Sequence, residues 1–254
     1  MAERLSTGMR TDLARAFAKI FENGILDIRS GTQPTTGDLT ESGSLLCSCT
    51  ASSGTLTQEV RATATITVTG GSVAGSFTAI AIGGVTTTGI DILGATVTWA
   101  SSHTNAAALI AAQINTYNSI GITATSTDAI VTLTAPPGVG AVTWDVTTTV
   151  AGDATVTDAN FSGGTAPVNG LKFGIAASGA VAITGTWSGV IATSGTAGWA
   201  RLYDADYITG ASTTARRMDF SIATSGADIN LSSTTLTAGA TLTIGSGTIT
   251  VPAS

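Results

Sequence analysis

Large apolar residues recur at helical spacing in two parts of the chain. Near its start they recur every four residues, which predicts a helix with one apolar stripe made of Leu5, Met9, Leu13, Phe17 and Phe21, with Ile20 beside them. Asn23 and Gly24 supply the left-handed stop expected just beyond a helix end. A second helix is expected at about 104–118, with Thr104-Asn105 as its N-cap. Its apolar face would consist of Ala107, Ile110, Ala111, Ile114 and Tyr117.

Elsewhere the chain alternates short apolar or β-branched runs with turn residues, a pattern typical of strands. In the C-terminal third, turns recur about every eight to twelve residues, which favours a sandwich or a jelly-roll-like arrangement. The expected strands are 25–28, 44–51, 62–69, 77–82, 90–99, 122–126, 129–135, 142–150, 171–173, 180–187, 198–203, 216–222, 240–243 and 247–251.

Charge is distributed unevenly and predicts an inserted domain. Residues 62–171 contain no Lys or Arg but keep five aspartates, whereas the whole chain has a net charge of −6. We therefore expect an inserted β-rich module with one helix at 62–165. It would interrupt a discontinuous β-sandwich-like domain, made of 1–61 and 166–254, which carries the N-terminal helix. The expected fold class is mainly β.

Composition narrows the range of partners. Only 10% of the residues are charged, against about 25% in ordinary soluble domains, which suits close contact with protein neighbours; an isolated secreted β domain is the alternative. A net charge of −6 argues against nucleic acid, whose backbone needs clustered cations. No apolar run approaches the length of a membrane span. Glu3 and Arg4 stand where a secretory signal would be apolar, so synthesis and assembly in a cytoplasm are expected.

Half of the ten basic residues lie in the first 29 positions, where four acids accompany them. This interleaved charge is explained either by a solvated helix face or by a docking element that meets a charged partner.

Cys47 and Cys49 lie in a run, LLCSCT, that predicts a strand. Residues i and i+2 of a strand point to the same face, and their separation is near the limit for a disulfide, so a mutual bridge would be strained. Two thiols do not complete a zinc site. We expect buried free thiols; a crosslink between subunits is the alternative.

Catalysis needs positioned groups with tuned protonation, which usually include His, Cys or paired carboxylates. The single histidine of the chain, His103, is expected in a polar loop just before the second helix. Residues 185–189 (GTWSG) place the serine one position late for a nucleophile elbow. No glycine motif for phosphate or dinucleotide binding appears. We therefore expect no enzymatic activity and no catalytic, cofactor-binding or metal-binding residue.

Two polar pairs and four tryptophans leave alternatives open. Asp204 and Asp206 would suit calcium only weakly, because two carboxylates without further oxygen ligands favour a solvated turn. The Arg216-Arg217 doublet is expected as an exposed strand end, or as a partner for a neighbour's carboxylates. The tryptophans lie in strand-like contexts, which favours core anchoring over a sugar-stacking platform: Trp99, Trp144, Trp187 and Trp199.

Three groups of segments together resemble a family of bacteriophage virion structural proteins. They are 5–10 (LSTGMR) with 23–34 (NGILDIRSGTQP); 170–174 (GLKFG), 186–189 (TWSG) and 195–203 (GTAGWARLY); and 224–235 (TSGADINLSSTT). The inserted region, with 94–99 (GATVTW), looks like a module of phage tail and fibre proteins. These motifs are structural, and no catalytic or cofactor residue comes with them.

The resemblance implies an accessory subunit that is attached to the tail or neck or decorates the capsid. Its partners would be other virion proteins and further copies of itself, and it would be assembled in the host cytoplasm. The alternative is a host-recognition module that binds surface glycan; an exposed tryptophan cluster would favour it, whereas buried tryptophans would favour the structural role.

Overall fold

The chain divides into two compact units. The computed structural model describes residues 4–84, 89–99, 101–117 and 120–253. One unit is discontinuous and comprises Met1–Gln58 and Pro167–Ser254; the other is the insertion Glu59–Ala166. The insertion thus begins three residues before the expected position 62 and ends one residue after the expected position 165. The mainly β fold class, with an N-terminal helix and one inserted helix, is confirmed.

The larger sheet of the discontinuous unit has eight strands in the order β16-β15-β14-β1-β2-β13-β18, with β17 also paired to β14. All of its pairings are antiparallel except β15 with β16. The strands are β1 (Ile25–Ser30), β2 (Leu45–Ala51), β13 (Trp187–Val190), β14 (Gly195–Tyr203), β15 (Arg217–Ala223), β16 (Ile229–Asn230), β17 (Thr235–Leu236) and β18 (Thr241–Ile244).

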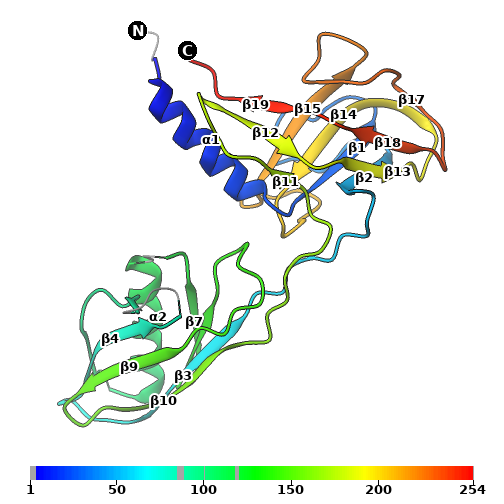
Figure 1. Ribbon diagram of the computed structural model, residues 1–254. Helices are drawn as coiled ribbons and strands as arrows, with labels where there is room; N and C mark the ends of the chain where they lie inside the picture. Colours follow the sequence, from blue (N-terminus) through cyan, green and yellow to red (C-terminus); the bar gives the residue numbers. More distant parts are fainter. Residues whose placement is uncertain (1–3, 85–88, 100, 118–119, 254) are drawn as a thin grey trace. The chain divides into compact units, whose positions relative to one another are not determined.

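A second sheet completes a sandwich in this unit (Figure 1). It has the order β11-β12-β19, with β11 at Lys172–Phe173, β12 at Ala180–Thr184 and β19 at Thr248–Thr250. Apolar side chains of the two sheets form one core, which includes Leu26, Ile28, Leu202, Trp187 and Ile183.

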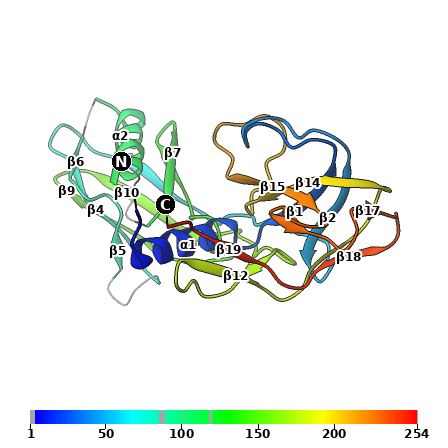
Figure 2. The same cartoon turned by 90° about the horizontal axis from the view of Figure 1, so that it is seen from above.

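Helix α1 (Thr7–Phe21) lies along β12 and β19 (Figure 2). Ser6 caps its start, because the Ser6 hydroxyl accepts a hydrogen bond from the Met9 N–H at 3.2 Å. The helix ends as expected: Asn23 has φ of 65°, in the left-handed region. Gly24 follows because a Cβ there would collide with the Tyr203 carbonyl oxygen.

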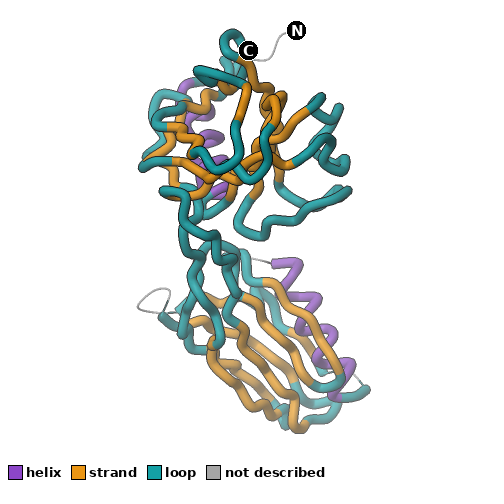
Figure 3. The backbone as a smooth tube through the Cα atoms, turned by 90° about the vertical axis from the view of Figure 1, so that its right-hand side faces the viewer, coloured by secondary structure: helices purple, strands orange, loops and turns teal. Residues whose placement is uncertain are grey.

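The inserted unit contains two further sheets and one helix. The first sheet has the order β10-β3-β8-β7; in the second, β4 pairs with β5, β6 and β9. These strands are β3 (Thr63–Gly70), β4 (Ser76–Ile82), β5 (Ile90–Asp91), β6 (Val97–Thr98), β7 (Thr123–Thr127), β8 (Ile130–Thr134), β9 (Val146–Ala151) and β10 (Thr155–Ser162). Helix α2 (His103–Tyr117) contacts β7, β3 and β8 (Figure 3).

Helix α2 packs with the expected apolar face, but its start differs from the prediction. Ile110 and Ile114 are fully buried, whereas Tyr117 is half exposed. The N-cap is Ser102, whose hydroxyl accepts from the Asn105 N–H at 3.2 Å, so the helix begins at His103 rather than at Thr104-Asn105. Residue 118, the expected last residue, lies outside the described residues.

Two expected strands are each split by a turn. In the run 90–99, the Asp91 carboxylate accepts hydrogen bonds from the N–H groups of Ile80, Leu93 and Gly94, which bends the chain between β5 and β6. In the run 180–187, Gly185 adopts φ of 68°, and the chain passes from β12 in the smaller sheet to β13 in the larger one.

Candidate functional site

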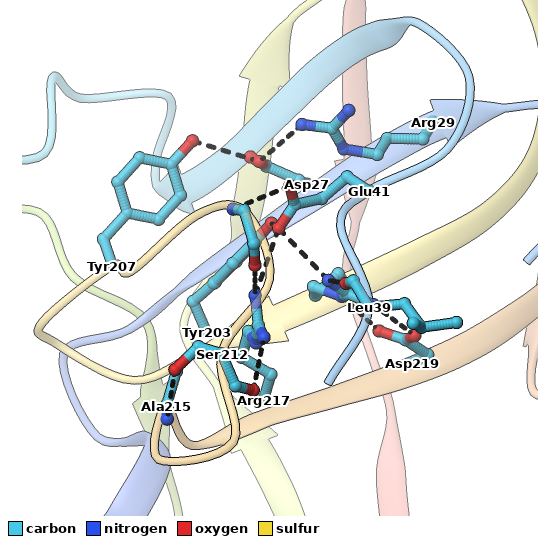
Figure 4. A network of polar contacts seen from close by, with 12 residues as sticks. Asp27, Arg29, Leu39, Glu41, Tyr203, Tyr207, Ser212, Ala215, Arg217 and Asp219 are labelled. Carbon is cyan, nitrogen blue, oxygen red and sulfur yellow. Dashed lines mark hydrogen bonds and ion pairs between the residues drawn. The ribbon is translucent and has the colours of Figure 1, made fainter. Parts of the chain in front are cut away.

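The outward face of the larger sheet carries a row of polar residues in register. Ser48 on β2 lies opposite Asp27 on β1, Asp27 lies opposite Arg201 on β14, and Arg201 lies opposite Asp219 on β15. Successive strand residues point to opposite faces, so the neighbours Leu26 and Leu202 point into the sandwich core. This row is the centre of a charged cluster that also contains Arg29, Glu41, Tyr203, Tyr207 and Arg217 (Figure 4).

Arg201 is the central cation of the charged cluster and is fully buried. Its guanidinium binds Asp219 in a bidentate manner, with Nε–Oδ1 at 2.6 Å and Nη2–Oδ2 at 2.7 Å. Nη1 donates to the Leu39 carbonyl at 2.8 Å and to Glu41 at 3.1 Å. Burial alone would lower the pKa of Arg201, but Asp219 raises it, so the side chain remains charged.

Glu41 joins two connecting segments, 31–44 and 204–216, to the sheet. Its carboxylate accepts hydrogen bonds from the Tyr203 hydroxyl at 2.7 Å and from the Gly210 N–H at 3.0 Å. Arg217 reaches the same carboxylate at 3.3 Å and donates to the carbonyls of Gly210 and Ser212. Burial would raise the pKa of Glu41, but these donors, led by Tyr203, lower it to about 2.

Asp27 lies between Ser48 and Arg201 in the row of polar residues. Its carboxylate accepts from the Ser48 hydroxyl at 2.6 Å and from the Tyr207 hydroxyl at 3.0 Å, and Arg29 lies 3.8 Å away. Burial is the dominant influence and raises the pKa of Asp27 above its ordinary value. Burial and the nearby Asp27 raise the pKa of Tyr207 to about 12, so its hydroxyl remains a donor at neutral pH.

The charged cluster is arranged as a structural clamp. It contains three carboxylates (Asp27, Glu41, Asp219) and three guanidinium groups (Arg29, Arg201, Arg217), so the charges balance. The side chains of Asp27 and Glu41 are 0% and 6% exposed, so no dissolved reactant reaches them while the two segments stay closed. A general acid or base must lie within hydrogen-bond reach of its substrate.

The two polar pairs singled out in the sequence bind within the chain. Arg216 contacts Asp204 at 2.8 Å and Asp206 at 3.8 Å, so both carboxylates form ion pairs within the chain. The expectation that both arginines form an exposed strand end is wrong for Arg217, which is 1% exposed and belongs to the charged cluster. Among the described residues, no group of three or more His, Cys, Asp or Glu could hold a metal ion.

His103 and Ser188 show no arrangement for nucleophilic chemistry. His103 is exposed and begins α2 instead of preceding it, with its ring edge-on to Trp99 at 5.3 Å between centroids. Ser188 is buried, and its hydroxyl is bound to that of Ser53 at 2.8 Å. A serine nucleophile needs an adjacent base, and a second hydroxyl does not supply one.

Three of the tryptophans belong to the apolar cores, and Trp199 does not. Trp99, Trp187 and Trp199 are buried, but Trp199 lies on the outward face of β14, where its ring centroid is 5.3 Å from the guanidinium carbon of Arg201. Trp144 is partly covered and packs edge-on against Phe161 at 5.7 Å. Within the part of the chain that the structure describes, there is therefore no exposed tryptophan cluster of the kind that would favour glycan binding.

Cys47 and Cys49 are both buried and free, as expected. They lie on β2 and point into the core of the sandwich. A hydrogen bond between the two thiols, together with burial, raises the pKa of Cys49, so that thiol stays protonated and unreactive.

Helix α1 divides the expected apolar stripe between two faces. Phe17 and Phe21 pack on the β core together with Ala14, which has no exposed surface. Three large residues lie on a second, solvent-exposed face of the helix, Met9, Leu13 and Ile20, and Leu5 is exposed just before the N-cap Ser6. We call Met9, Leu13 and Ile20 the outer face of α1; Met9, at 52%, is the most exposed.

Sequence reasoning missed the charged cluster. A usable signal existed, because charged residues recur at alternate positions of β1 (Asp27, Arg29) and β15 (Arg217, Asp219) in a chain that is otherwise poor in charge. The role of Glu41 carried no such signal, since it comes from a connecting segment far from its partners in sequence.

No helix in the described residues is both long and apolar enough to cross a membrane. Searches of protein-family models, curated proteins and solved structures found no match to this chain.

Proposed function

We propose that this chain is a non-enzymatic structural subunit of a bacteriophage particle, an accessory protein attached to the tail or neck or decorating the capsid. The resemblance of its segments to virion structural proteins suggests the particle. The outer face of α1 is the single observation that supports a docking role most strongly.

The outer face of α1 suits attachment to a neighbouring protein. Three large apolar side chains are exposed on one side of a helix whose other side is already packed on its own sheet. Burying such surface stabilises a contact by about 25 cal/mol per Å² of apolar area. Contiguous exposed apolar patches on soluble proteins commonly mark sites of interaction with other proteins. Arg15 and Asp12 are also exposed on this helix and can select the partner by charge.

The charged cluster supports a structural role in a different way. It holds two long connecting segments on the sheet through the ion pairs of Glu41 with Arg201 and Arg217 and through side-chain hydrogen bonds to the backbone of both segments. A subunit that must keep one shape in a repeated assembly benefits from such fixation. Repeated use of one patch is typical of closed symmetric oligomers, so we include self-association in the proposal.

The proposal is tested by the protein content of particles. Phage particles from cells infected with the phage that encodes this chain would be purified on a density gradient and quantified by mass spectrometry. We expect the chain to co-migrate with infectious particles at a constant ratio to the major capsid protein. Its absence from the particles, with an abundant free pool in the lysate, would contradict the proposal.

A further inference from the structure

The larger sheet has two open ends that border one opening. In the strand order the terminal strands are β16 and β18. Residues 228–231, which contain β16, and residues 243–246, at the end of β18, line the same space of about 410 Å³. The sheet therefore curls so that its first and last strands face each other across this opening.

An apolar pocket of about 280 Å³ lies next to the opening. Its lining includes Leu26, Trp187, Leu202 and Phe220 from the core side of the sandwich. Asp228, Ile229 and Ile244 line both the pocket and the opening, so the two spaces are adjacent. A cavity of roughly 150 Å³ holds one benzene ring, so this pocket has room for about two apolar side chains.

The two bordering strands carry no charged residue and no proline, although β16 is protected in part by its length of only two residues. An edge strand presents unpaired N–H and C=O groups, and proteins usually shield them with charge, proline or bulges. Here Asp228 is the last charged residue of the chain, and the segment from 229 through β18 contains no charge and no proline. On β18, Leu242 and Ile244 are partly covered, whereas Thr241 and Thr243 are exposed.

We propose that this opening binds an extended segment of another protein as an added strand between β16 and β18. Two apolar side chains of that segment, at alternate positions, would enter the pocket. Alternate residues of a strand lie about 6.6 Å apart on one face, which suits a pocket for two side chains. Backbone hydrogen bonds would supply affinity and the pocket would supply selectivity, as in other cases of strand addition.

Charge specifies the occupant further. The middle of the added segment should be uncharged, because the two bordering strands offer no ion-pair partner along their length. One end should carry a basic residue beside Asp228. That carboxylate lies at the rim and accepts hydrogen bonds from the N–H and hydroxyl of Ser221, which lower its pKa and keep it ionised.

The segment is assigned to another protein because, in the described residues, the strands of this chain are already paired in its own sheets. Residues near the two termini are also bound, since the Leu5 N–H donates to the Ala253 carbonyl at 3.1 Å. The inference goes beyond the proposed virion role, and it holds for any partner that presents such a segment.

The test uses the full chain and two synthetic peptides. The first is acetyl-Lys-Ser-Thr-Ile-Thr-Val-Thr-Ser-amide; the control is the same peptide with methylated Ile and Val nitrogens, which keeps the side chains but removes two donors. By calorimetry we expect the first peptide to bind with Kd below about 1 mM and at least about tenfold more tightly than the control. Hydrogen exchange should slow at 229–231 and 241–244 but not in β3.

A variant pair locates the site. Ile244→Lys places a charge at the opening and should weaken binding at least about tenfold, whereas Thr241→Lys, on an exposed position of the same strand, should not. If Ile244→Lys fails to fold, the peptide pair on the unmodified protein still decides. Equal binding of both peptides, or no binding at about 1 mM, would overturn the inference. The inference would also be overturned if the protein formed a dimer without peptide and the same amides were protected in it. A second copy of this chain would then occupy the edge.

Discussion

The charged cluster shows how few residues can fix two long segments. One side chain, that of Arg201, binds Asp219, Glu41 and the Leu39 carbonyl, and it has no solvent exposure of its own. Buried ion pairs contribute little when compared with an apolar replacement, but removing one partner leaves the others uncompensated in a low dielectric. Removing one arginine of the cluster should therefore lower the free energy of unfolding by more than its own ion pair contributes to it.

Replacing Arg201 tests how strongly the stability of the protein depends on the charged cluster. We expect Arg201→Ala to lower the free energy of unfolding by about 3–5 kcal/mol, because Asp219 loses its bidentate partner while it remains buried. Arg15→Ala, which breaks the exposed pair with Asp12, should cost less than about 0.5 kcal/mol. Denaturant unfolding of both variants would measure the difference, and equal losses would show that the cluster is not a clamp.

The pH dependence of stability tests Glu41. Its pKa is about 2 in the folded protein and 4.5 as a free side chain, so its contribution is complete above pH 4.5 and is lost as the pH falls from 4.5 toward 2. Glu41→Gln should therefore reduce stability at pH 7 and flatten the stability curve below pH 4.5.

Asp27 should affect the pH dependence of stability in the opposite direction to Glu41. Burial raises its folded pKa above 3.8, so its ionisation costs stability as the pH rises past that value, and its protonation partly offsets the loss from Glu41 in acid. Asp27→Asn removes this offset and should make the acid loss steeper. Thermal unfolding from pH 2 to 7 would check both variants; a Glu41→Gln curve parallel to that of the unmodified protein would exclude the assigned role of Glu41.

At the level of elements, the periodic pattern of apolar residues predicts helices and strands where one face of the element is buried and the other is exposed. Helix α1 and the strands around Ile66, Ile80 and Val131 follow from such patterns, although only Phe17 and Phe21 of the α1 stripe pack on the core. The splits in the runs 90–99 and 180–187 did not follow, because each depends on one residue: the Asp91 carboxylate binds the N–H groups of Ile80, Leu93 and Gly94, and Gly185 adopts φ of 68°.

The missed strand β10 has a similar explanation. Asp and Asn are depleted in strands, yet β10 contains Asp158 and Asn160. Asp158 accepts from the Thr148 N–H at 2.7 Å, and Asn160 accepts from the Val146 N–H at 2.9 Å, so both side chains bind the backbone of β9. Sequence alone does not show such partners, and the same limit applies to Glu41 in the charged cluster.

The outer face of α1 offers a prediction that leaves the fold intact. Deleting the helix would also remove Phe17 and Phe21 from the core, so substitutions on the exposed side are the sharper test. We expect Met9→Glu with Leu13→Glu to reduce incorporation into particles at least about tenfold. Stability should change by less than about 0.5 kcal/mol per site, because both side chains are exposed.

A matched control comes from the same unit. Ile175 is 94% exposed and lies outside α1, so Ile175→Glu should leave incorporation unchanged. Complementation of a phage that lacks this gene, followed by mass spectrometry of purified particles, would compare the variants. Normal incorporation of the Met9/Leu13 variant would show that the outer face of α1 has no role in docking.

For the whole molecule, the two units have separate cores. The insertion's core draws on residues 62–161, and the other apolar clusters contain only residues of the discontinuous unit. Each unit also closes its own chain ends: Thr57 pairs with Val168, and Val60 pairs with Thr165, through backbone hydrogen bonds of 2.8–3.2 Å.

These pairs predict that the insertion can be removed. Joining Gln58 to Pro167, directly or through a short Gly-Ser linker, should leave a soluble remainder with the β circular dichroism signature and unchanged co-operative unfolding. Residues 59–166 expressed alone should also fold. Insoluble remainders with several different linkers would show that the two units depend on each other.

We propose that this chain occupies a fixed position in a phage particle and docks through α1. A cryo-electron microscopy reconstruction of the intact particle would test both points. We expect repeated density that fits the discontinuous unit at the tail, the neck or the capsid surface, with a neighbouring protein covering Met9 and Leu13. A complete particle without such density, or a bound copy whose α1 faces solvent, would show that the proposal is wrong.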